Sequence, residues 1–246
     1  MQDFTGQHII VTGGTRGIGR GITEGFLQAG ATVVATYTSN DQAAQELALA
    51  VADFPGQLDL RKFDVSNVAE VGTFFQYIED RYPAIDVLVN NSGIRRDAVM
   101  ALMSDEEWSQ VLAVNLNGTF FMTRKIIPIM MKKRYGRIVN ISSVGAELGL
   151  PGQANYAASK AAQVAMSKTL AKEVGKKGIT VNSLCPGFIE TELLADLTPE
   201  QKKTYTSQVP LRRFGKIQEV VHGVLFLASR EASYISGTSL NISGGL

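Results

Sequence analysis

Short apolar segments rich in β-branched residues alternate along the chain with longer segments whose apolar residues recur at helical spacing. The segments expected to form strands are 7–12, 31–37, 59–64, 86–91, 137–143, 180–185 and 239–242. Those expected to form helices are 18–29, 41–53, 67–81, 105–134, 155–176 and 217–229. Most strand candidates are continuously apolar, which indicates strands buried on both faces. Strand–helix alternation with short joints then predicts right-handed βαβ units and a parallel sheet.

This alternation continues without a linker, a repeat or a low-complexity segment. We therefore expect residues 1–246 to form a single doubly wound α/β domain of the Rossmann type, with a central parallel sheet of about seven strands. Ligands of such sheets bind beyond the carboxyl ends of the strands. The polar stretch 192–215 lacks strong periodicity, and we expect it to be a mobile substrate lid. A pair of ordinary surface helices is the alternative.

Composition excludes several classes of protein. The net charge of +1 argues against a nucleic-acid binder that depends on bulk charge. The only cysteine is Cys185 and the only histidines are His8 and His222, so we expect no disulfide framework, no metal site and no Ser-His-Asp triad. The N-terminus lacks a signal-peptide pattern, and no apolar run approaches the ~18 residues of a membrane span. These features favour a cytoplasmic protein that uses neither a membrane nor nucleic acid.

A glycine-rich turn joins the first expected strand to the first expected helix. It contains Gly13, Gly17 and Gly19, a spacing that differs from the G-x-G-x-x-G pattern. Glycines allow the backbone to approach a ligand closely, and a helix N-terminus offers N–H groups and a positive dipole. The turn therefore predicts a pyrophosphate site, the alternative being a tight turn without a ligand.

The residues at the next strand ends favour NADP over NAD. An NAD site usually has Asp or Glu at the end of the second strand, but residues 36–39 contain neither. Arg16 in the glycine turn could pair with a 2′-phosphate. Without the neighbouring motifs, the same residue would be interpreted as a solvated surface arginine. Asp64-Val65 and 90–93 fall where adenine and ribose would lie, and as isolated strings they would be turn or cap residues.

Four residues suggest ketone reduction. Tyr156 and Lys160 are four apart and share one helix face, and Ser143 ends the fifth expected strand. A nearby ammonium should lower the pKa of a tyrosine that exchanges a proton with substrate, and a serine hydroxyl can stabilise the oxyanion. Asn115 precedes a poor helix-forming stretch, where a local break could free a carbonyl or side chain to hold a water. Ser142 is the alternative to Ser143 as the serine that contacts the substrate carbonyl. The segment 186–191 could wrap a nicotinamide, with Thr191 near a phosphate.

Together these motifs resemble the short-chain dehydrogenase/reductase family, from about residue 5 to the C-terminus, and within it the 3-oxoacyl-(acyl-carrier-protein) reductases. The segments that carry the subgroup resemblance are 91–94, 152–156, 186–191 and 209–215. The resemblance implies a catalytic tetrad of Asn115, Ser143, Tyr156 and Lys160, with Ser143 and Tyr156 also contacting substrate. Ser92 departs from the usual alanine, and Asp64 replaces an asparagine of some members.

The motifs and the resemblance together give one set of cofactor positions. They are Gly13, Thr15, Arg16, Gly17, Ile18, Gly19, Thr38, Asp64, Val65, Asn91, Gly93, Tyr156, Lys160, Pro186, Gly187, Ile189 and Thr191. The cofactor that the resemblance implies is NADPH, and the reaction is reduction of a 3-oxoacyl thioester in fatty-acid elongation. The residues themselves leave three alternatives open: an acetoacetyl-CoA reductase of polyhydroxyalkanoate synthesis, another NADP-dependent secondary-alcohol dehydrogenase, and a non-catalytic dinucleotide sensor. A sensor would need none of Ser143, Tyr156 and Lys160.

Basic residues close two of the expected helices. They include Arg134 and Lys177, and one interpretation is that they complement the helix C-terminal dipoles. In the family these two positions are associated with docking of the acidic acyl carrier protein. In a βαβ unit such helix ends lie opposite the active-site edge, so docking would serve a neighbouring subunit. The resemblance implies a homotetramer, and small residues along 155–170 would permit close helix packing.

Overall fold

A computed structural model describes residues 2–192 and 198–246. In these residues seven parallel strands form one sheet, in the order β3-β2-β1-β4-β5-β6-β7. The strands are β1 His8–Val11, β2 Thr32–Tyr37, β3 Gln57–Lys62, β4 Val87–Asn90, β5 Gly136–Ile141, β6 Ile179–Pro186 and β7 Ser239–Ile242. The expected α/β architecture and strand number are confirmed. The order reverses between β1 and β4, the place where open parallel sheets bind ligands.

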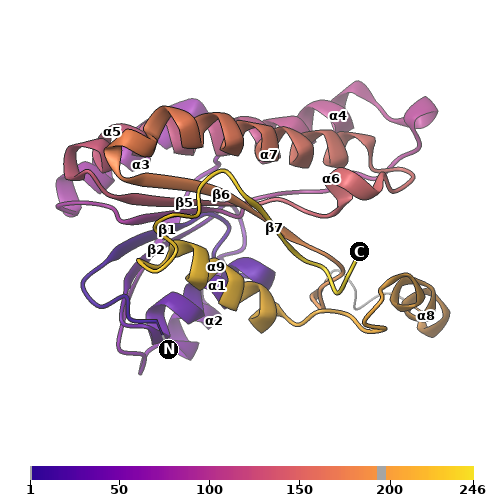
Figure 1. Ribbon diagram of the computed structural model, residues 1–246, viewed down its shortest axis with the longest axis horizontal. Helices are drawn as coiled ribbons and strands as arrows, with labels where there is room; N and C mark the ends of the chain where they lie inside the picture. Colours follow the sequence, from indigo (N-terminus) through magenta and orange to yellow (C-terminus); the bar gives the residue numbers. More distant parts are fainter. Residues whose placement is uncertain (1, 193–197) are drawn as a thin grey trace.

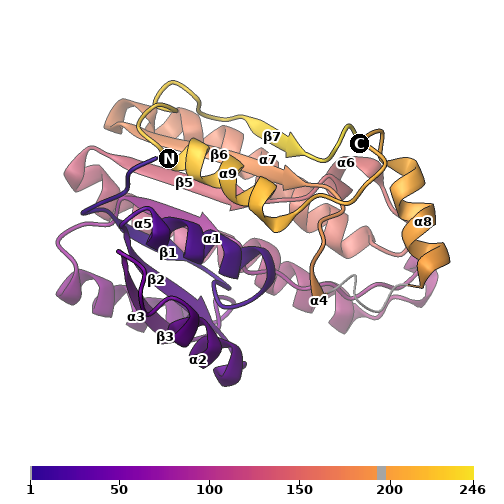
Figure 2. The ribbon, with the colours of Figure 1, turned by 90° about the horizontal axis from the view of Figure 1, so that it is seen from below.

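Helices cover both faces of this sheet (Figures 1 and 2). One face carries α1 Gly17–Gln28, α2 Asp41–Ala50 and α9 Ile217–Ala228. The other face carries α3 Val68–Arg81, α5 Thr119–Lys133 and α7 Ala154–Val174. Three further helices, α4 Asp105–Leu112, α6 Gly145–Leu148 and α8 Pro199–Gln208, lie at the end toward which the strands point (Figure 1). The ligand edge of the sheet is therefore the edge these helices surround.

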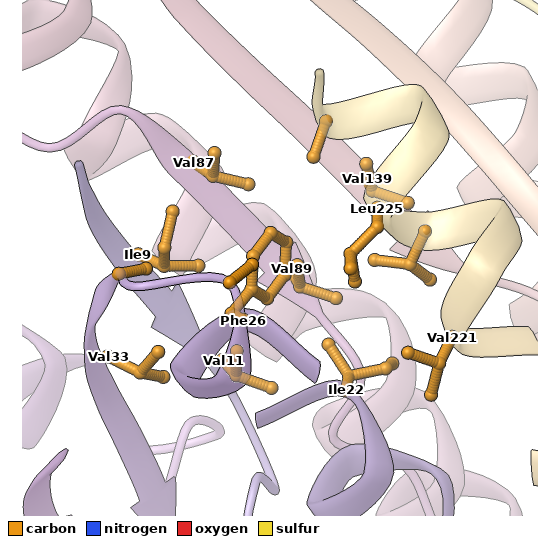
Figure 3. Packing of buried hydrophobic residues seen from close by; sticks show 14 of the residues in the cluster. Ile9, Val11, Ile22, Phe26, Val33, Val87, Val89, Val139, Val221 and Leu225 are labelled. Carbon is orange, nitrogen blue, oxygen red and sulfur yellow. The ribbon is translucent and has the colours of Figure 1, made fainter. Parts of the chain in front are cut away.

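The central strands have an apolar face toward each helix layer, which explains the continuous apolar runs. Ile9 belongs to the same buried cluster as Phe26 of α1 and Val221 of α9 (Figure 3). Its neighbour Ile10 belongs to the other cluster, with residues of α3, α5 and α7. All four side chains are fully buried. Because a fully buried aliphatic or phenyl side chain contributes about 1.5–3 kcal/mol, the two layers fix the sheet firmly beneath the site.

Several boundaries differ from the sequence-based expectation. The segment 105–134 is not one helix, because a π-helix, Ala113–Gly118, separates α4 from α5. Strand β3 lies two residues earlier than expected. Strand β5 ends at Ile141, so Ser143 lies two residues beyond the strand rather than at its end. Within 192–215, residues 199–208 form α8, closed at its start by a capping box on Thr198, and 193–197 lie outside the described residues.

Two findings on the described residues bear on function. None of the described helices is both long and apolar enough to span a membrane. No group of three or more His, Cys, Asp or Glu side chains in the described part of the chain is arranged to hold a metal ion.

Candidate active site

Tyr156 and Ser143 meet at the ligand edge of the sheet. Tyr156 lies in the first turn of α7, and Ser143 follows β5. A Cβ on Gly145 would lie 3.2 Å from Ser143 Oγ and 3.6 Å from Tyr156 Cε1, so all three residues enclose one small space. Ser142 points elsewhere, because its hydroxyl donates to the main-chain oxygen of Lys160 at 2.9 Å. The geometry therefore favours Ser143 over its rival as the partner of Tyr156.

Burial raises the pKa of Tyr156 above its ordinary value. A hydrogen bond with Ser143 and the positive charge of Arg95 lower that pKa but do not outweigh burial. The guanidinium carbon of Arg95 lies 5.9 Å from the centre of the Tyr156 ring. The sequence predicts that Lys160 lowers the pKa of Tyr156, whereas in this structure burial has the larger effect and raises that pKa, which suits a proton donor.

Lys160 is a buried cation one turn further along α7. Only 4% of the residue is exposed, and its Nζ lies 5.7 Å from the centre of the Tyr156 ring. Nζ donates to the main-chain oxygen of Ile141 at 2.7 Å and to Gln163 Oε1 at 3.3 Å. Burial lowers the pKa of Lys160 to about 8. The ammonium is thus close to its titration point at neutral to mildly alkaline pH.

The π-helix brings Asn115 beneath these residues. Its side chain is held by the backbone of Ile94: Oδ1 accepts from Ile94 N at 2.8 Å and Nδ2 donates to Ile94 O at 3.1 Å. The main-chain oxygen of Asn115 accepts from Thr119 Oγ1 at 2.7 Å and from Gln163 Nε2 at 2.6 Å. The expectation that this break leaves a carbonyl or side chain free for a water is therefore wrong. A carbonyl oxygen has two lone pairs, and here both face protein donors.

The glycine turn fits a pyrophosphate. Helix α1 begins without a side-chain cap, since its N-cap residue Arg16 makes no capping hydrogen bond. By contrast, α2, α3, α4 and α8 are all capped by side chains. Gly17 has φ +52, and a Cβ there would meet nothing within 4 Å, so the turn is open on its ligand side. Uncapped N–H groups beside open space are what an anionic group requires.

The strand ends next to the turn hold it in place. Asn91 Nδ2 donates to the main-chain oxygens of Thr12 at 2.9 Å and Gly13 at 3.0 Å. Gly93 lies close to the reaction residues, since a Cβ there would be 3.4 Å from Asn115 Oδ1 and 3.5 Å from Lys160 Nζ. The segment 91–93 therefore runs from the glycine turn, which Asn91 contacts, to the reaction residues near Gly93.

Asp64, Val65 and Thr38 lie further along the same edge. The carboxylate of Asp64 accepts from both N and Oγ of Ser66, at 2.8 Å each, so it shapes the turn after β3. Val65 is buried against Gly118, where a Cβ would come within 2.7 Å of its Cγ2. Thr38 is exposed at the end of β2.

The segment after β6 faces the glycine turn. Pro186 ends β6, Gly187 N donates to Ile242 O at 2.9 Å, and Ile189 pairs with Gly215. Thr191 and Gly17 line one cavity of about 340 Å³. Most of the other residues that line this cavity come from α1 and the start of α9, so it lies between the segment after β6 and the outer side of α1.

Several polar residues of the site were missed by the sequence analysis. Asn155 is fully buried, and its Nδ2 donates to the main-chain oxygen of Arg96 at 2.9 Å, which fixes the 95–97 loop at the start of α7. Gln153 Nε2 donates to Asp97 Oδ2 at 3.2 Å on the same loop. Gln163 lies behind Lys160. The signal available for Gln163 was a polar residue three positions after Lys160, on a helix face that packs on the sheet.

Arg134 and Lys177 are brought together at the opposite edge of the sheet. Arg134 ends α5 with φ 55, and its Nη2 donates to the main-chain oxygen of Lys176 at 3.3 Å. Lys177 closes the short helix Gly175–Lys177 that follows α7. The preceding Lys133 pairs instead with Asp86 at 2.6 Å. Arg134 thus contacts a neutral carbonyl rather than a carboxylate.

Comparison with known proteins covers almost the whole chain. A family model described as enoyl-(acyl carrier protein) reductase matches residues 11–246. The chain is 43% identical over 241 residues to the 3-oxoacyl-(acyl-carrier-protein) reductase FabG of Thermotoga maritima, with 98% of each chain covered. It is 44% identical to the FabG of Haemophilus influenzae, with the same coverage, and 42% identical to that of Escherichia coli over 99% of this chain and 98% of the relative. The matched region includes every residue placed above.

Proposed function

The chain belongs to the short-chain dehydrogenase/reductase family of nicotinamide-dependent enzymes, and from this we propose that it reduces 3-oxoacyl-(acyl-carrier-protein) to the 3-hydroxyacyl form in fatty-acid elongation. The proposal includes NADPH as the cofactor and the cytoplasm as the compartment. One observation carries it: Ser143 and Tyr156 lie side by side, and the buried ammonium of Lys160 lies 5.7 Å from the centre of the Tyr156 ring.

The residues of the site divide the work of ketone reduction. The reduced nicotinamide, when bound, supplies a hydride for the 3-oxo carbon. Ser143 donates a hydrogen bond to the carbonyl oxygen, and Tyr156 donates the proton that turns the developing alkoxide into a hydroxyl. The ammonium of Lys160 stabilises the phenolate left on Tyr156. The family description names an enoyl reduction, but paired hydroxyls suit a carbonyl oxygen, which needs donors as its charge grows.

Arg16 and the glycine turn support NADPH in particular. The exposed Arg16 adjoins the uncapped start of α1, and no carboxylate follows β2 within 36–39. A guanidinium fits a phosphate dianion, whereas a carboxylate at this edge would repel it. The residues expected to hold the rest of the cofactor are 64–65, 91–93 and 186–191. In the described part of the predicted lid, α8 and the residues from there to 215 would close over the substrate.

A side-by-side assay tests the proposed substrate. NADPH oxidation is measured with acetoacetyl-(acyl carrier protein), acetoacetyl-CoA and a cyclic ketone, and NADH replaces NADPH in a parallel set. We expect the carrier-bound substrate to be preferred by about tenfold or more in kcat/KM, and NADPH over NADH by a similar factor. A preference for the CoA thioester would instead support polyhydroxyalkanoate or CoA-ester metabolism. Turnover of only the cyclic ketone would overturn the proposal that the substrate is a 3-oxoacyl thioester. Cofactor binding without any turnover would support a dinucleotide sensor.

We also propose that Arg134 and Lys177 form a docking surface for the acyl carrier protein. These residues lie at the edge opposite the active site, so a carrier docked there would deliver its substrate to a neighbouring subunit, as in a homotetramer whose helices pair across a two-fold axis. An acyl carrier protein is acidic, and positive groups at a docking surface speed and orient its approach.

Charge reversal tests this docking surface. Arg134→Glu and Lys177→Glu should each raise KM for the carrier-linked substrate by about tenfold and leave the cyclic ketone unaffected, because only the carrier reaches this edge. Arg81→Glu, an exposed reversal at the end of α3, is the control for the change in net charge. Equal effects on carrier-linked and small substrates would contradict docking at Arg134 and Lys177.

A further inference from the structure

Gln163 is a fully buried polar residue in direct contact with Lys160. Its Nε2 lies 2.6 Å from the main-chain oxygen of Asn115 and 2.8 Å from Thr119 Oγ1, and its Oε1 accepts from Lys160 Nζ at 3.3 Å. A carbonyl oxygen can only accept, so the amide nitrogen must face Asn115. The amide oxygen is then left for the ammonium.

The two groups that Gln163 joins come from different features of the fold. The Lys160 ammonium has one other protein acceptor among the described residues, the carbonyl of Ile141 at the end of β5. The Asn115 carbonyl accepts side-chain donors because it lies in the π-helix, where the α-helical pairing is interrupted. The Gln163 side chain therefore links the buried Lys160 ammonium to the Asn115 carbonyl, which the π-helix leaves without its usual helical partner.

We propose that Gln163 is a positioning residue for the reduction: its amide holds the Lys160 ammonium and the Asn115 carbonyl together. This inference rests on the proposed function for the role of Lys160 in the reaction.

Few charged or titratable groups surround Lys160, so its hydrogen bond to Gln163 should have a clear effect on the Lys160 pKa. The titratable groups that face Lys160 in the described residues are Tyr156 on its own helix and Cys185 on β6, while β5 and the π-helix present a carbonyl and an amide. The Arg95 guanidinium lies near the Tyr156 ring from the loop after β4, and Asp97 pairs with it. Burial has already lowered the pKa of Lys160 to about 8, so loss of one acceptor should lower it further.

Two substitutions that should shift the Lys160 titration midpoint in opposite directions distinguish this role from simple packing. Gln163→Leu keeps the side-chain size but removes the acceptor, and should lower the Lys160 midpoint by about one pH unit. Gln163→Glu places a carboxylate beside the ammonium and should raise it. Ser167→Ala is the matched control, one turn further along α7, where Ser167 accepts from Asn140 Nδ2 at 2.8 Å without touching Lys160. It should lower stability and leave the midpoint unchanged.

The midpoint is first measured without cofactor or turnover. Protein labelled with ¹³C at lysine Cε is titrated by NMR, and the Lys160 signal is identified by its loss in Lys160→Met. We expect the order Leu below wild type below Glu. The same order should appear in the alkaline limb of kcat against pH, because the reaction needs the protonated ammonium and activity falls as pH rises through the Lys160 midpoint.

The outcomes distinguish this inference from the proposed function. Unchanged NMR midpoints in both Gln163 variants, with stability lowered as in Ser167→Ala, would overturn the positioning role even if the protein is an active reductase. Shifted midpoints in a protein that reduces no ketone would support the contact and overturn the proposed function instead.

Discussion

Tyr156→Phe is expected to lower kcat for ketone reduction by about two to four orders of magnitude, the usual contribution of a positioned proton donor. The phenyl ring keeps the packing of Tyr156 at the start of α7, so only the hydroxyl is lost. With no proton supplied, the alkoxide would have to take one from water. Ser143 can still donate a hydrogen bond to the carbonyl, which leaves a small residual rate.

The measurement is kcat for acetoacetyl thioester reduction, together with NADPH affinity and thermal unfolding. The unfolding midpoint should stay close to wild type, because the phenol is needed for the reaction rather than for the fold. Any loss of NADPH affinity should be far smaller than the loss of kcat. Tyr234→Phe is the control, since Tyr234 is entirely exposed. If Tyr156→Phe retained more than about a tenth of wild-type kcat, another group would have to be the proton donor.

Gly19→Ala is expected to remove cofactor binding and to lower the free energy of unfolding by about 2–4 kcal/mol. A Cβ on Gly19 would lie 2.1 Å from Gly13 O and 2.4 Å from Asn91 Nδ2. Those two atoms are hydrogen-bonded to each other at 3.0 Å, and their bond ties the glycine turn to the end of β4. The methyl group would therefore have to separate the turn from β4.

The control lies in the same turn. A Cβ on Gly17 would contact nothing within 4 Å, but φ is +52, so Gly17→Ala should cost only about 1–2 kcal/mol of backbone strain. Urea unfolding without cofactor compares the two variants, and NADPH fluorescence titration measures binding by Gly19→Ala. Wild-type NADPH affinity in Gly19→Ala would show that the cofactor does not use this turn.

The sheet could be predicted from the sequence because its strands are buried on both faces. Ile9 and Ile10 belong to opposite apolar layers, so the first strand is apolar from Ile9 to Val11, and helical segments separate it from the next strands. The glycine turn, the strand-end polar residues and the Tyr156–Lys160 spacing are local in sequence. Once a parallel sheet is assumed, all of them must fall on its carboxyl edge.

The contacts between these local features could not be predicted in the same way. Ser142 and Ser143 are neighbours, and only the path of the chain beyond Ile141 turns one toward Lys160 and the other toward Tyr156. The poor helix formers after Asn115 indicated a break, but periodicity cannot distinguish a π-turn from a loop. Gln163 was missed because its partners lie on two other elements, and a polar residue on a buried helix face has no periodic signal.

The order of the strands has a consequence for synthesis of the chain. Strands β2 and β3 extend the sheet outward from β1 on one side, and β4 then pairs with β1 on the other, with Ile9 opposite Val87. From there β5, β6 and β7 are each added to the edge strand that the chain formed just before. No later strand has to be inserted between two that are already paired. The protein can therefore fold from its N-terminus while it is being translated, leaving at each stage one open sheet edge for the next segment to cover.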